Sequence, residues 1–87
     1  MSEIKIVERQ LIDGDHLGKR DVDALIALPM GSQVTYTGFA SPVKLMNGAN
    51  FAQGTYMRGY MEALKVKIKI VEKSYENMSL TLQLVNR

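Results

Sequence analysis

Two alternating stretches near the C-terminus decide the fold of this chain: KVKIKI at residues 65–70 and LTLQLV at residues 80–85. In both stretches every second residue is aliphatic, which is the period of a β-strand that buries one face. The mostly polar residues 72–77 between them have the composition of a turn. The sequence therefore predicts an antiparallel hairpin with one apolar and one solvated face.

Two further strands are predicted upstream of the hairpin. Residues 4–11 alternate imperfectly between aliphatic and polar side chains, and residues 33–39 are rich in β-branched and aromatic side chains. Asp13-Gly14-Asp15 ends the first of these strands, because Gly and Asp tolerate the backbone angles of a turn.

A short helix is predicted between these two strands. Val22, Leu25 and Ile26 are spaced so that they share one helical face. Asp21 is placed to cap the N-terminus, and Pro29 ends the helix because proline disfavours helical geometry in the residue before it. We expect this helix to pack against the sheet, since two turns are unstable alone.

The central part of the chain predicts additional β-structure. Asn47-Gly48 lies between two short apolar runs, which is typical of a hairpin turn. Residues 54–64 fit either a helical face or a strand, and Gly54 and Gly59 both disfavour a helix. We therefore favour a bent strand, in which glycines mark bulges or tight bends.

Together these elements predict one α+β domain over residues 1–87. Its expected architecture is a small antiparallel β-sheet or a partly open β-barrel with one short packed helix. With 46% hydrophobic and 23% charged residues, the composition is that of a globular protein. The absence of cysteine excludes disulfides and thiolate chemistry and favours a reducing compartment. With neither a signal-peptide pattern nor an apolar run of membrane-spanning length, we expect a cytoplasmic protein without membrane contact.

Positive charge is concentrated in the second half of the chain. Residues 1–43 hold four basic and six acidic side chains, whereas residues 44–87 hold seven basic and three acidic ones. Lys65, Lys67 and Lys69 alternate at a period of two, so a strand would present all three on one face, about 7 Å apart. Lys73 would continue this row. The asymmetry predicts an anionic partner for the C-terminal half.

The candidate nucleic-acid-binding residues combine cations with aromatic rings. Phosphates would be neutralised by the lysine row and by Arg58 and Lys44, while Tyr36 and Tyr60 would stack on bases. Lysines on the solvated face of a strand are also common without any ligand, and at a sheet edge they prevent aggregation.

Catalytic and metal sites are not predicted. His16 is the only histidine, and although Asp13 and Asp15 are near in sequence, no nucleophile or second catalytic group accompanies it. One histidine without cysteine is a poor basis for a transition-metal site. We therefore expect a protein without cofactors that is not an enzyme, with His16 in an exposed loop.

Two functions follow from these patterns. The leading hypothesis is a non-catalytic domain that binds single-stranded nucleic acid, with RNA favoured over DNA, through its lysine-lined strand face. The alternative is a small protein-binding inhibitor or adaptor of the kind encoded by phages and mobile elements, acting on a host protein or ribonucleoprotein. Such a protein would pair an edge strand with its target, or with a second copy to form a homodimer.

Overall fold

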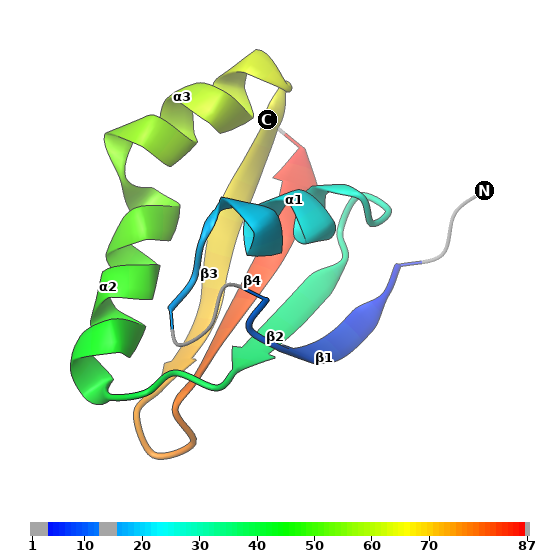
Figure 1. Ribbon diagram of the computed structural model, residues 1–87. Helices are drawn as coiled ribbons and strands as arrows, with labels where there is room; N and C mark the ends of the chain where they lie inside the picture. Colours follow the sequence, from blue (N-terminus) through cyan, green and yellow to red (C-terminus); the bar gives the residue numbers. More distant parts are fainter. Residues whose placement is uncertain (1–3, 13–15, 87) are drawn as a thin grey trace.

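The computed structural model describes residues 4–12 and 16–86, which form four strands and three helices. In chain order these are β1 (Ile6–Gln10), α1 (Lys19–Ile26), β2 (Gln33–Thr37), α2 (Pro42–Gln53), α3 (Thr55–Ala63), β3 (Val66–Ser74) and β4 (Ser79–Asn86). The strands make one mixed sheet in the order β1-β2-β4-β3 (Figure 1). β1 and β2 are parallel, and β4 is antiparallel to both β2 and β3. The α+β class is confirmed, but the sheet is open and mixed, and three helices replace the single one expected.

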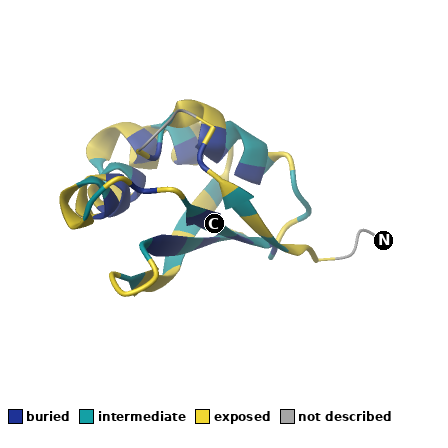
Figure 2. Ribbon diagram, turned by 60° about the horizontal axis from the view of Figure 1, so that its bottom comes forward, coloured by how far each residue is buried: buried dark blue, intermediate teal, exposed yellow. Residues whose placement is uncertain are grey.

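The three helices lie on one face of the sheet, and no other element among the described residues covers the opposite face (Figure 2). On the helix-covered face, Leu80, Leu82 and Leu84 of β4 are buried together with Val34 and Tyr36 of β2. The intervening side chains form the open face, on which the hydroxyl oxygens of β2 and β4 threonines lie 2.8 Å apart. Side chains alternate across a strand, so the leucine period of β4 separates the two faces.

The predicted C-terminal hairpin is confirmed. β3 and β4 pair antiparallel, with Ile68 opposite Leu84 and Ile70 opposite Leu82. A β-bulge follows Ile70 and shifts the register before the turn. Beyond the bulge, side chains of β3 lie on the opposite face of the sheet from the one that a continuous alternation would predict.

The predicted first helix is also confirmed, but it begins two residues earlier than its expected cap. α1 starts after Gly18, and Asp21 is its third residue. The buried Asp21 carboxylate accepts hydrogen bonds from the N–H groups of Ile12, at 2.7 Å, and Gly18, at 3.3 Å. The Tyr36 hydroxyl donates to the Asp21 carbonyl oxygen at 2.6 Å. The hydrogen bond from Tyr36 connects α1 to β2 of the sheet. The turn predicted at residues 13–15 lies outside the described residues.

The hairpin predicted around Asn47-Gly48 is wrong, because these residues lie in the middle of α2. Ser41 caps this helix by accepting a hydrogen bond from the Lys44 N–H at 3.2 Å, and Pro42 occupies the first helical position. Gly48 is needed for packing: a Cβ atom there would lie 2.9 Å from Cε1 of Phe39. The glycine thus permits close approach of a helix rather than a reverse turn.

The bent strand favoured for residues 54–64 is also wrong, because they contain α3. Met57 and Met61, one helical turn apart, are buried against Val22 of α1. Gly54 separates α2 from α3, and Gly59 faces open space, where its missing side chain creates no cavity. Burial of the methionine face therefore outweighs the low helix propensity of glycine, which costs about 1 kcal/mol.

Alanine at the two helical glycines should change stability in opposite directions. Gly59→Ala adds a methyl group where nothing lies within 4 Å, and should stabilise the protein by about 0.5–1 kcal/mol. Gly48→Ala forces the new methyl group against Phe39, and should cause a net loss on the order of 1 kcal/mol despite its better helix propensity. Urea denaturation of both variants measures the difference. Equal stabilisation of the two would contradict the close packing of α2.

Candidate functional site

The structure divides the predicted lysine row. Lys67 and Lys69 are exposed on the open face of β3, opposite Val85 and Gln83. Lys65 precedes the strand in a left-handed conformation, with φ at 60°, and its N–H donates to the Glu62 carbonyl oxygen at 3.0 Å. It therefore belongs to the turn that ends α3. The strand presents two lysines on the open face rather than three.

Lys73 does not continue the row, because of the β-bulge after Ile70. The shifted register places Glu72 opposite Thr81, on the open face, and Lys73 opposite Leu80, on the other face. The Lys73 ammonium group lies 5.6 Å from the centre of the Tyr75 ring. The open face of β3 thus carries Lys67 and Lys69 followed by an acidic side chain.

Arg58 and Lys44 lie in different places relative to β3. Arg58 is on α3 and lines a hollow beside β3 together with Lys67. Lys44 is on α2 and lines a separate hollow with His16 and Asn47, next to the segment before α1. Arg58 and Lys67 therefore border the same hollow, whereas Lys44 does not.

Neither predicted stacking tyrosine contributes to the open face. Tyr36 is fully buried on the helix-covered face, and burial, together with the nearby Asp21 charge, raises the pKa of its hydroxyl above the usual value. Tyr60 lies in the helix layer, where its hydroxyl donates to Asp23 Oδ1 at 2.7 Å. The Lys19 ammonium group lies 4.9 Å from the Tyr60 ring centre and 2.9 Å from Asp23 Oδ2. Tyr36 is thus a core residue, and Tyr60 joins α3 to α1.

The contact between α1 and α3 can be tested through the titration of Asp23. The hydrogen bond from Tyr60, and next the one from Lys19, lower the pKa of the Asp23 carboxyl below its usual value. Replacing Tyr60 by Phe should therefore raise the pKa of Asp23, as measured by carboxyl-carbon NMR titration. Because the pKa of Asp23 is lower in the folded than in the unfolded chain, its ionised carboxylate stabilises the fold at pH values above the pKa of aspartate in the unfolded chain. This contribution should disappear as the pH falls through the folded-state pKa.

Tyr56→Phe provides the control for this titration. Tyr56 lies on the same helix and is exposed, and its ring is near Phe51 rather than Asp23. This variant should leave the pKa of Asp23 unchanged. If Tyr60→Phe also left it unchanged, Tyr60 would not be the main cause of the shift.

β3 forms one edge of the sheet, and the hydrogen bonds of β4 show which of its backbone groups face outward. The N–H and C=O of Leu84 bond to Ser32 and Gly31, on the β2 side of β4. Ile68 is directly opposite Leu84, so its own N–H and C=O point away from β4. The alternation extends this orientation to Val66 and Ile70. We call these outward backbone groups of Val66, Ile68 and Ile70 the β3 edge.

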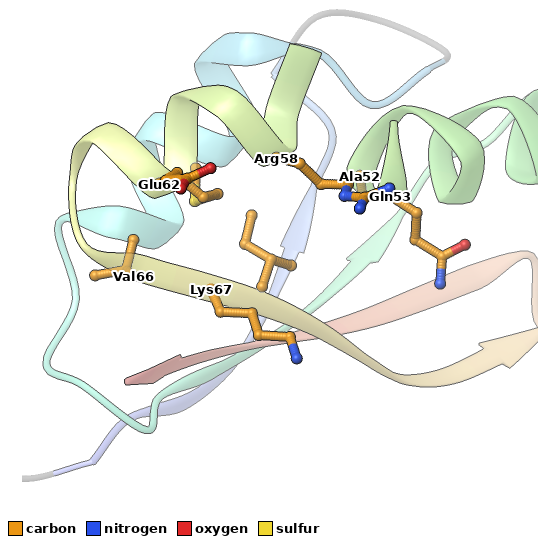
Figure 3. A pocket seen from close by; sticks show the side chains of 8 residues that line it. Ala52, Gln53, Arg58, Glu62, Val66 and Lys67 are labelled. Carbon is orange, nitrogen blue, oxygen red and sulfur yellow. The ribbon is translucent and has the colours of Figure 1, made fainter. Parts of the chain in front are cut away.

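A hollow of about 650 Å³ lies beside the β3 edge, between β3 and the ends of α2 and α3 (Figure 3). Its apolar lining consists of Ala52, Met61, Val66 and Ile68. Its polar lining consists of Gln53, Arg58, Glu62 and Lys67. In Figure 3 the Arg58 side chain extends toward the end of α2, and Lys67 points away from α3 on the other side of β3. We call this hollow the β3 groove.

The cations of this surface are visible in the sequence, whereas its groove and its outward-facing backbone are not. Val66, Ile68 and Ile70 were interpreted only as the apolar face of a hairpin. Their N–H and C=O groups point to the outer edge of the sheet because β4, rather than β3, pairs with β2. Strand order is not encoded in the local pattern, so no signal in residues 65–70 could have identified the edge.

Other classes of site receive no support from the described residues. Within residues 4–12 and 16–86, no three His, Cys, Asp or Glu side chains gather where they could hold a metal ion. In the same residues, no helix combines the length and apolarity needed to cross a bilayer. His16 is exposed, with Nδ1 3.4 Å from the Leu17 carbonyl oxygen. In comparisons with protein-family models, curated proteins and solved structures, none matches this chain.

Proposed function

We propose that this chain is a non-catalytic protein-binding module that pairs the β3 edge with an extended segment of a partner. The observation that carries the proposal is the outward orientation of the N–H and C=O groups of Ile68. Unpaired strand backbone is a template for another strand, and several recognition domains bind peptides in this way. Such a module acts as an inhibitor or adaptor, because it binds a segment of the partner and leaves the covalent structure of that segment unchanged.

The surroundings of the edge support a specific site rather than a passive sheet margin. From Val66 to Ile70 the strand is regular, and the bulge that interrupts pairing comes only afterwards. A strand added here would project alternate side chains toward the β3 groove, where apolar surface is available. Main-chain hydrogen bonds would then supply affinity, and the groove would supply selectivity.

Methylating the backbone nitrogen of Ile68 should weaken binding of a peptide selected from a displayed random library. The methyl group removes the outward donor and blocks a close strand, while the Ile68 side chain is unchanged. We expect affinity to fall about tenfold or more, as measured by calorimetry with chemically synthesised protein. Amide exchange at Val66, Ile68 and Ile70 should slow when the peptide binds.

N-methylation of Glu8 is the matched control, because β1 forms the opposite edge of the sheet. Lys5 and Leu11 bond to β2, so the alternation turns the Glu8 N–H outward. This variant should bind the selected peptide normally. Peptides that leave exchange at Ile68 unchanged, or that bind the Ile68-methylated protein equally well, would rule out the proposed edge.

Binding of single-stranded RNA is the second candidate function, and one observation favours it. Lys67 and Lys69 are exposed on the open face, and neither forms an ion pair with another described residue. Their spacing of about 7 Å allows both to reach one phosphate chain. Base stacking is not part of this candidate, because Tyr36 is buried and Tyr60 is engaged with α1.

An RNA titration at several salt concentrations tests this second candidate. We consider the slope of the logarithm of the binding constant against the logarithm of the salt concentration. If both lysines contact phosphates, the double variant Lys67→Gln with Lys69→Gln should reduce the magnitude of this slope by about 1.4, since each contact on a single strand contributes about 0.7. Lys44→Gln, which removes a charge beside a different hollow, should leave the slope unchanged. The lysine face would be excluded as an RNA site if no binding occurred at low salt. It would also be excluded if Lys44→Gln changed the slope as much as the double variant does.

A further inference from the structure

The charges along the β3 edge specify the chemistry of the partner segment, if the proposed strand pairing is correct. Lys67 and Lys69 project from the open face, and Arg58 lines the groove on the other side. None of these three cations forms an ion pair with another described residue. Glu62 also lines the groove, and Glu72 lies on the open face beyond the bulge. Along the regular part of β3, from Val66 to Ile70, both charged side chains are positive.

Strand pairing would place partner side chains directly opposite these lysines. Side chains opposite one another in neighbouring strands have Cβ atoms about 4.5–5.5 Å apart, so opposite charges attract and like charges repel. Residues opposite Lys67 and Lys69 would share the open face with them. The residue between, opposite Ile68, would project toward the groove and meet Ala52 and Met61.

A second copy of this chain fits the β3 edge poorly. In an antiparallel pair centred on Ile68, Lys67 of each copy would face Lys69 of the other. Both lysine pairs would then place like charges opposite each other, which is destabilising. The charge pattern therefore disfavours self-pairing in this register and favours a different chain with acidic side chains.

We infer that the β3 edge recognises an extended protein segment in which two acidic residues flank one apolar residue. The acidic side chains pair with Lys67 and Lys69 on the open face. The apolar side chain enters the groove between Ile68 and the α2–α3 layer, where the flexible Met61 adapts to its shape. This inference rests on the proposed function and adds the chemical class of the partner.

Synthetic peptides of eight residues test the inference directly. In one peptide Glu alternates with Val, and in two others Gln or Lys replaces each Glu. The protein should bind the Glu peptide at least about tenfold more tightly than the Gln peptide, and the Lys peptide least of all. Exchange of the Ile68 amide should slow only when a peptide is bound.

Charge reversal provides the specific control. The double variant Lys67→Glu with Lys69→Glu should prefer the Lys peptide, and its thermal unfolding should confirm that it remains folded. Lys44→Glu makes the same kind of change beside a different hollow and should retain the preference for the Glu peptide. A reversal of preference confined to the double variant would establish the pairing of charges.

The failures of the two proposals are distinguishable. Equal affinity for the Glu and Gln peptides, with Ile68 protected by both, would overturn the acidic partner and leave strand pairing intact. Binding of every peptide without protection of Ile68, or no binding at all, would overturn both. If oligouridylate bound more tightly than the Glu peptide and left Ile68 unprotected, the surface would be a nucleic-acid site and the inference would be wrong.

Discussion

Burial of the leucine row of β4 is the constraint on which the rest of the structure depends. Leu80, Leu82 and Leu84 are almost completely buried, and one strand can bury three such side chains only beneath a covering layer. The helices provide that layer on a single face, held in part by the hydrogen bond that the Tyr36 hydroxyl donates to the Asp21 carbonyl oxygen. Each leucine side chain contributes on the order of 1.5–3 kcal/mol when fully buried. Among the described residues the open face carries no comparable apolar row, and it therefore stays in contact with solvent.

The same constraint produces the candidate binding surface. β4 is central because β2 and β3 both pair with it, and β3 is thereby left at the edge. α2 and α3 must reach the outer part of the sheet to cover Val66 and Ile68, and the β3 groove lies where they meet the strand. Packing of the core thus places an outward-facing strand backbone, an apolar hollow and two lysines side by side.

The sequence predicted correctly those elements whose structure is decided by neighbouring residues, and failed where contacts with distant segments decide it. The C-terminal hairpin and α1 were predicted correctly, because the periods of their apolar residues dominate these segments. α2 and α3 were missed because Asn47-Gly48 and Gly59 suggested turns and strands, while the packing of Gly48 against Phe39 involves a distant segment. For the site, Lys67 and Lys69 were placed correctly on an exposed strand face. Lys65 and Lys73 were misplaced because a helix end and a bulge interrupt the alternation.

By itself the sequence determined the α+β class, the apolar face of the C-terminal hairpin and the positive charge of that region. These properties depend on side-chain type and on spacing along a few residues, which the chain carries before it folds. Only the tertiary structure decided that β3 is an edge strand, that Tyr36 is buried and that the Ile68 backbone faces outward. Those properties depend on which strand pairs with which, and that choice is made by contacts between segments far apart in the chain.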